Sequence, residues 1–216
     1  MFKTGFRKKE EKLDTSLCSN LLPLLFERLA VNKRLVILDV GPASPATVKF
    51  FTQFKCRLNF VDLYTEDVVL NAEDDATHEE LVEQFHSALN LPDETAIDLC
   101  LFWDFFNYLD GQALMAFIEA LAPYIGNDTR GYALGVLNAR TSLPNYQYGI
   151  EGRGRLSQSP NKQEQMQVFP HSQRDLKQLL DYFTIDKSRL ISDGRVEYVL
   201  FKSSHRGVSK EPIFGL

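Results

Sequence analysis

Cysteine, tryptophan and long apolar runs are scarce in this chain of 216 residues. Its three cysteines, Cys18, Cys56 and Cys100, are widely spaced and form no C-x-x-C motif, which argues against a disulfide framework or a thiolate metal site. No stretch reaches the roughly 18 apolar residues of a membrane span, and the charged N-terminus lacks the apolar segment of a signal peptide. We therefore expect a reduced, cytoplasmic protein with no membrane partner.

Several ligand-binding motifs are absent as well. The sequence GPASPA that begins at Gly41 lacks the G-x-G-x-x-G pattern of dinucleotide-binding enzymes, and no G-K-[ST] follows it. The histidines share no spacing that would set two of them on one helical face, so no metal is predicted. The net charge of −5 argues against a surface that grips nucleic acid as a whole, although a local basic patch stays open.

The composition that is present is that of an ordinary globular protein. An apolar fraction of 44% and a charged fraction of 25% predict neither disorder nor a fibrous repeat. The length suits one domain with a sizeable core. We expect a charged N-terminal arm over residues 1–14, a single domain over 15–203 and a loose C-terminal tail over 204–216.

Strand-like and helix-like patterns alternate along the chain. Strands are predicted at 35–40, 57–63, 97–103 and 132–137, and helices at 15–29, 46–54, 79–89, 111–121 and 172–183. A short strand is the expectation at 68–70, and the turn Ser192-Asp193-Gly194 predicts a hairpin of 185–191 with 195–202. This order predicts an α/β fold with a doubly wound, mostly parallel sheet, helices on both faces and a C-terminal antiparallel hairpin.

Such sheets bind ligands at the carboxyl ends of their strands, where the winding direction reverses. Three predicted strands end near Asp39, Asp62 and Trp103, so we expect the ligand crevice there. The long polar segment 138–169 follows the next strand and is predicted to be a loop. Its Tyr146, Tyr148 and Arg153 suit a lid over the crevice, and a solvated excursion is the alternative.

A helix leading into Asp39-x-Gly41, a second strand that ends on Asp62 and a closing hairpin together resemble the class I S-adenosylmethionine-dependent methyltransferases, over about residues 17–202. The resemblance implies a Rossmann-like fold with S-adenosylmethionine as the cofactor. Gly41 matches the family's first glycine, Asp39 its acidic position, and Asp62 the acid that accepts hydrogen bonds from the ribose hydroxyls. The cofactor-binding residues that we expect are Asp39, Gly41, Pro42, Ala43, Asp62, Leu63 and Trp103.

The segment 102–109 resembles the family's fourth-strand exit, which lines the pocket between cofactor and methyl acceptor. Here Asp104 is the candidate general base, with Asn107 and Tyr108 as orienting groups. The alternative is that Asp104 and Asn107 shape a turn and cap the helix that follows. The acceptor, whether small molecule, protein or RNA, and the oligomeric state stay open.

Two residues depart from the family's glycine pattern. Ala43 and Pro45 stand where further glycines are usual. Methyl transfer to an unidentified acceptor is therefore one prediction, and a non-catalytic, methyltransferase-like binding or interaction protein is the alternative.

Overall fold

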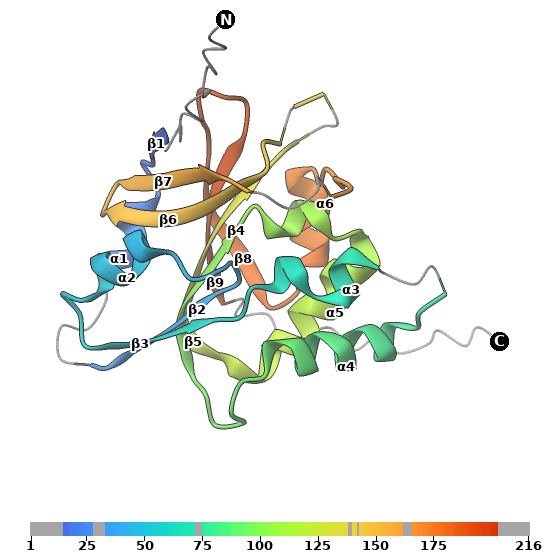
Figure 1. Ribbon diagram of the computed structural model, residues 1–216. Coiled ribbons are helices and arrows are strands. Elements are labelled where there is room, and N and C mark those ends of the chain that lie inside the picture. Colours follow the sequence, from blue (N-terminus) through green and yellow to red (C-terminus); the bar gives the residue numbers. More distant parts are fainter. Residues whose placement is uncertain are drawn as a thin grey trace, which may run out of the picture.

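The computed structural model describes residues 15–27, 33–71, 75–137, 140–141, 143–161 and 166–202. The predicted arm and tail lie outside these residues. The described chain forms a six-stranded and a three-stranded sheet, with helices packed on both faces of the larger one (Figure 1). In the part of the chain that is described, no helix has the length and apolarity needed to cross a bilayer. The cytoplasmic location stays a prediction.

The larger sheet has the strand order β3-β2-β4-β5-β9-β8. Its first four strands run parallel, β9 is antiparallel to β5, and β8 is antiparallel to β9. The bounds are Leu35–Asp39 for β2, Cys56–Phe60 for β3, Ile97–Trp103 for β4, Ile125–Gly135 for β5, Phe183–Leu190 for β8 and Val196–Lys202 for β9. The predicted fold class, including the C-terminal hairpin, is confirmed.

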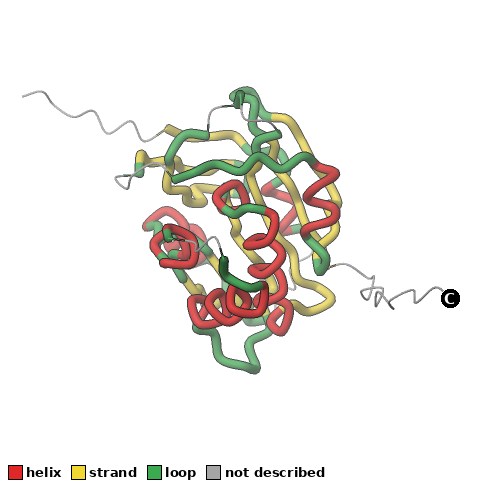
Figure 2. Tube along the Cα trace, turned by 90° about the vertical axis from the view of Figure 1, so that its right-hand side faces the viewer, coloured by secondary structure: helices red, strands yellow, loops and turns green. Residues whose placement is uncertain are grey.

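Helices cover both faces of this sheet. α1 (Leu22–Phe26) and α2 (Pro45–Phe51) lie on one side, and α3 (Asp67–Leu70), α4 (His78–Leu89), α5 (Gly111–Leu121) and α6 (Gln173–Leu179) on the other (Figure 1). Figure 2 views the molecule from the side of the latter group, with the strands behind the helices. Three 3₁₀ turns complete the main elements: η1 (Leu63–Thr65), η2 (Phe105–Tyr108) and η3 (Ala122–Tyr124).

Local sequence explains where several helices begin. Pro45 opens α2 at a position where its missing N–H costs no hydrogen bond. Thr77 and Glu80 form a reciprocal capping box at the start of α4, and the Asp110 side chain accepts a hydrogen bond from the Ala113 N–H at the start of α5. These caps stabilise the helices that flank the strand ends.

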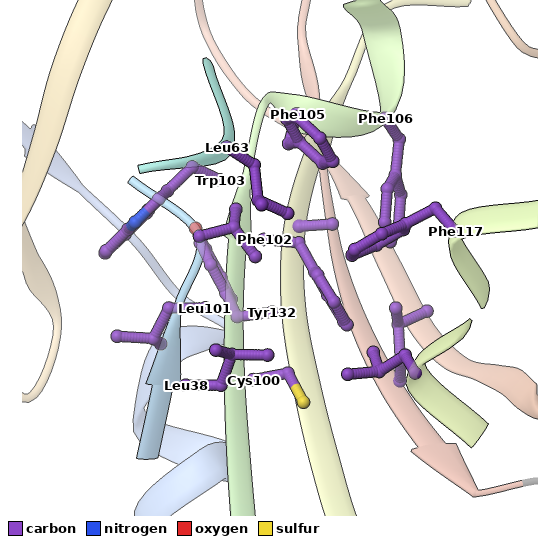
Figure 3. Close-up of a cluster of buried hydrophobic side chains, with 14 of the residues drawn as sticks. Leu38, Leu63, Cys100, Leu101, Phe102, Trp103, Phe105, Phe106, Phe117 and Tyr132 are labelled. Carbon is purple, nitrogen blue, oxygen red and sulfur yellow. The ribbon is translucent and has the colours of Figure 1, made fainter. Parts of the chain in front are cut away.

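The central strand β4 is buried along its whole length, as its continuous apolar sequence predicts. Phe102 and Phe106 pack beside Phe117 of α5 in one aromatic cluster (Figure 3). Trp103 points away from this cluster, toward the other side of the strand (Figure 3). The end of β4 is therefore anchored in the core while its last side chain faces the predicted crevice.

Three local predictions are wrong. The segment 138–169 is not a loop throughout: β6 (Tyr146–Gly152) and β7 (Arg155–Pro160) form a hairpin, and β1 (Thr15–Cys18) pairs with β7 in the smaller sheet. Residues 15–18 are thus a strand, and among the described residues of the predicted helix only Leu22–Phe26 is helical, because pairing with a distant partner outweighs the local helical spacing. Residues 68–70 belong to α3 and not to a strand, since the Leu70 and Asn71 N–H groups bond back to Glu66 and Asp67.

Candidate functional site

The carboxyl ends of three adjacent strands meet where the crevice is predicted. β2 pairs with β3 on one side and with β4 on the other. Beyond the strands, the Val40 N–H donates to Leu101 O at 3.1 Å and the Leu63 N–H donates to Val40 O at 2.8 Å. The backbone that carries Asp39, Asp62 and Trp103 is therefore held together at one edge of the sheet.

The Asp39 carboxyl group is buried at this edge, with 1% of the residue exposed. Its Oδ1 accepts hydrogen bonds from the Gly41 N–H at 3.0 Å and from the Trp103 Nε1–H at 2.6 Å. Its Oδ2 is buried and has no hydrogen-bond partner among the described residues. Burial, with a smaller contribution from the negative charge of Asp62, raises the pKa of Asp39 to about 8. Asp39 is thus predominantly protonated at neutral pH.

Trp103 covers the glycine that the cofactor is expected to approach. A Cβ atom placed on Gly41 would lie 3.3 Å from Cδ1 of the indole. Trp103 has a φ of 50°, in the left-handed region that a bulky side chain rarely adopts, at a cost of about 1–3 kcal/mol. The fold therefore holds this indole against Gly41 in a strained conformation.

The β6–β7 hairpin lies over the indole. The Tyr148 ring stacks on Trp103, with 5.7 Å between ring centroids and 14° between planes. The hairpin also packs on α2: the Ile150 N–H donates to Thr47 Oγ1 at 3.1 Å, and a Cβ on Gly149 would collide with Ser44 Oγ. The predicted lid segment thus sits on the crevice as an ordered hairpin.

Little free volume remains beneath it. The cavity lined by Gly41, Trp103 and Tyr148 measures about 10 Å³, which is about the space of one water molecule. Larger cavities of about 460 and 320 Å³ lie among α3, α4 and α5, and neither is lined by Asp39, Gly41 or Asp62. In this conformation Trp103 and Tyr148 leave little free volume beside Gly41.

The other predicted cofactor-binding residues differ in exposure. Asp62 is half-buried and left-handed, with a φ of 41°, and burial, followed by the charge of Glu66, raises the pKa of its carboxyl group. Pro42 is half-buried, Ala43 is exposed and Leu63 is fully buried in the core. Asp62 is therefore the predicted polar contact that stays accessible.

Asp104, the predicted base, is fully buried. Its Oδ1 accepts from the Tyr64 hydroxyl at 2.8 Å, and its Oδ2 accepts from the hydroxyls of Tyr148 at 3.1 Å and Tyr108 at 3.5 Å. Arg195, 1% exposed, donates from Nη1 to the Tyr148 hydroxyl oxygen at 2.6 Å. Burial raises the pKa of Asp104 to about 6, although the tyrosine hydrogen bonds and Arg195 favour its charged form.

Asn107 joins two elements. Its Nδ2 donates to the backbone oxygens of Asp104 at 2.7 Å and Leu134 at 2.9 Å, and its Oδ1 accepts from the Val136 N–H at 2.9 Å. Asn107 thereby ties η2 to the end of β5. Catalytic roles for Asp104, Asn107 and Tyr108 stay predictions; in this conformation all three side chains are engaged within the protein.

Sequence reasoning misses two members of the Asp104 cluster and misjudges a third. Tyr64 follows Asp62 and Leu63 directly, so its closeness to the strand end could have been inferred. Arg195 follows the predicted hairpin turn, but nothing in the sequence relates it to Asp104. Tyr148 is predicted to lie in a loop that closes over the crevice as a lid, whereas the structure places it in strand β6, with 5% of it exposed. Within the described ranges, no group of three metal-ligating side chains is placed to hold a metal ion.

No family model matches the chain. No curated protein matches it either. Solved structures do resemble it. The glycopeptide N-methyltransferase MtfA, solved with S-adenosyl-L-methionine, has 10% identity and a TM-score of 0.45, over 86% of this chain and 95% of that one. An S-adenosylmethionine-dependent methyltransferase from Clostridium acetobutylicum has 15% identity and a TM-score of 0.44, over 77% and 83%.

The pyocyanin biosynthetic protein PhzM is a further match, with 12% identity and a TM-score of 0.45 over 85% of this chain, which spans only 55% of PhzM. At identities of 10–15% and TM-scores of 0.44–0.45, these likenesses carry no conclusion about the family or the activity of this chain. These likenesses therefore do not show which ligand the crevice binds.

Proposed function

We propose that the methyltransferase-like chain uses the crevice between Asp39, Gly41 and Asp62 as an S-adenosylmethionine site and transfers a methyl group to an acceptor. The observation that carries the proposal is the unused Asp39 Oδ2 beside Gly41. A buried polar atom without a partner costs about 1–3 kcal/mol, and the closed fold gains nothing in return. A ligand's polar group at this atom accounts for the cost. The half-buried Asp62 carboxylate offers two acceptor oxygens for ribose hydroxyls at the next strand end.

The cavity beside Gly41 is too small for the cofactor in the described conformation. A cavity of about 10 Å³ is far below the several hundred Å³ of ordinary small-molecule sites. Trp103 and Tyr148 occupy the space over Gly41 that the methionine portion of the cofactor would need. The proposal therefore requires a second conformation in which this space is free.

Isothermal titration calorimetry with S-adenosylhomocysteine tests the site. Asp62→Asn removes the negative charge yet tolerates the left-handed backbone of this position, and we expect it to weaken binding by about 1.5–3 kcal/mol. Glu66→Gln, which removes the same charge from the adjoining turn, is the matched control and should bind as the parent does. Equal affinity of Asp62→Asn and parent would remove Asp62 from the site.

A second candidate function is a non-catalytic, methyltransferase-like interaction protein. The observation that favours it is the filling of the crevice by Trp103 and Tyr148, the latter bonded to both Asp104 and Arg195. In this second candidate function the crevice stays closed by Trp103 and Tyr148. Absence of binding heat in the parent and also in a variant with an opened crevice would favour it over methyl transfer.

A further inference from the structure

Two aromatic side chains from different elements take the place that a ligand would need. The Trp103 indole lies against Gly41 and donates to Asp39 Oδ1, the same atom that accepts from the Gly41 N–H. Tyr148, from β6, stacks on the outer face of this indole at 5.7 Å. The Trp103 indole thus lies beside Gly41, and its Nε1–H group makes the hydrogen bond to Asp39 at this position.

Tyr148 is fixed at its hydroxyl end by groups outside the glycine loop. The hydroxyl donates to Asp104 Oδ2 at 3.1 Å and accepts from Arg195 Nη1 at 2.6 Å. Arg195 in turn is paired with Asp193 at 2.6 Å. The Tyr148 ring therefore covers the crevice at Trp103, while its hydroxyl group is hydrogen-bonded to Asp104 and Arg195.

The hairpin that carries Tyr148 shares no strand with the larger sheet. β6 pairs only with β7 among the described strands, and β7 pairs with β6 and β1. The hairpin is joined to α2 through the Ile150 N–H and Thr47 Oγ1. Moving it off the crevice therefore breaks side-chain contacts, breaks the backbone hydrogen bond from Ser19 N–H to Gly154 O or carries β1 with the hairpin, and leaves the hydrogen-bond ladder of the larger sheet intact.

We propose that Tyr148 is an autoinhibitory plug: the β6–β7 hairpin closes the crevice, and S-adenosylmethionine binds only after Tyr148 has left Trp103. This inference rests on the proposed function. The apparent dissociation constant then equals the intrinsic one divided by the fraction of open molecules. Removing the plug strengthens binding without adding any contact to the ligand.

Calorimetric titration of S-adenosylhomocysteine into the parent, Tyr148→Ala and Tyr148→Phe tests the plug. Tyr148→Ala removes the ring and should bind at least about tenfold more tightly than the parent. Tyr148→Phe is the matched control, because it keeps the ring over Trp103 and loses only the hydroxyl contacts; its affinity should lie between the two. The same affinity in the parent and Tyr148→Ala, with clear binding in both, overturns the plug and leaves the cofactor site standing. Binding by none of the three overturns the cofactor site, and the plug with it.

Hydrogen exchange of the parent decides the matter if Tyr148→Ala does not fold. With S-adenosylhomocysteine at millimolar concentration, a plug that leaves predicts faster exchange in the backbone of 146–160 and slower exchange around Gly41 and Leu63. Slower exchange in both regions means that the hairpin closes over the ligand and contradicts the plug. Unchanged exchange in 146–160 together with protection at Gly41 contradicts it as well.

Discussion

Asp39 and Asp104 are two buried carboxyl groups at the ends of neighbouring strands, and their surroundings differ. Asp39 is 1% exposed and has both of its donors on one oxygen, with none on the other among the described residues. Asp104 is fully buried and receives tyrosine hydroxyls on both oxygens, with Arg195 close by. Burial raises the pKa of both, to about 8 for Asp39 and about 6 for Asp104.

Asp104 is thus a carboxyl group whose hydrogen bonds stabilise the fold, whereas Asp39 Oδ2 has no hydrogen-bond partner among the described residues. Removing a partner from a satisfied buried network leaves a charge or a polar group without compensation, which is costly. A buried carboxyl oxygen without a hydrogen bond, such as Asp39 Oδ2, already carries that cost. Asp104 thus connects the hairpin to the domain through Tyr148, whereas Asp39 is the better candidate for contact with a ligand.

The largest effect should come from removing the cation at the Asp104 cluster. Arg195→Met removes the buried cation that donates to the Tyr148 hydroxyl and whose charge favours ionised Asp104, and we expect a loss of about 3 kcal/mol in the free energy of unfolding, measured with urea, since hydrogen bonds to charged groups contribute about 1.5–3 kcal/mol. Asp193→Asn is the comparison, because it keeps a side-chain oxygen for the Arg195 guanidinium at the partly exposed end of the pair and should cost less than Arg195→Met. Comparable losses in the two variants would mean that Arg195 acts through Asp193 and not through Asp104.

A smaller effect is expected when only the hydroxyl between Arg195 and Asp104 is removed. Tyr148→Phe keeps the stacked ring but leaves Asp104 Oδ2 with the longer Tyr108 contact, at 3.5 Å, as its remaining side-chain hydrogen bond. The free energy of unfolding should fall by about 1–3 kcal/mol. The neighbouring half-buried Tyr146 provides the comparison, and Tyr146→Phe should stay within about 0.5 kcal/mol of the parent. A neutral Tyr148→Phe would show that the network does not hold the hairpin.

Much of this arrangement could be predicted from the sequence. The continuous apolar run of β4 and the acids at two strand ends predict a parallel sheet with Asp39 and Asp62 at one edge, because carboxyl ends of parallel strands share an edge. The turn Ser192-Asp193-Gly194 predicts the C-terminal hairpin, and Gly194 indeed adopts a positive φ of 87°, which its lack of a side chain permits.

The closed crevice could not be predicted in the same way. Residues 15–18 have apolar spacing that also suits a helix, and they become a strand only because residues 155–158 are there to pair with them. Likewise, Tyr148 alternates with polar neighbours, as an exposed or a half-buried strand would. Only the packing of the hairpin on Ser44 and Thr47 decides which face is buried. Such contacts depend on tertiary structure, which local periodicity does not encode.

Asp39→Asn should cause no loss of stability at neutral pH, and it gives the sharpest test of Asp39. The folded state raises the pKa of Asp39 from 3.8 to about 8, so between these values the folded chain binds a proton that the unfolded chain has lost. The stability due to this group is therefore complete below the lower pKa and is lost as pH rises toward the higher pKa, by at most about 1.4 kcal/mol per pH unit.

The pH range from about 6.5 to 8 lies above the pKa of about 6 for Asp104, so Asp39 should dominate the slope of stability against pH there. Because the amide of Asn is neutral like the protonated acid and ionises in neither the folded nor the unfolded chain, we expect Asp39→Asn to be more stable than the parent throughout this window and to lose the parent's decline with pH. Urea unfolding at several pH values measures both, with the exposed Asp67→Asn as a control that should keep the decline. A decline of equal steepness in Asp39→Asn and the parent would show that Asp39 is ionised in the folded chain, and the contrast with Asp104 would then disappear.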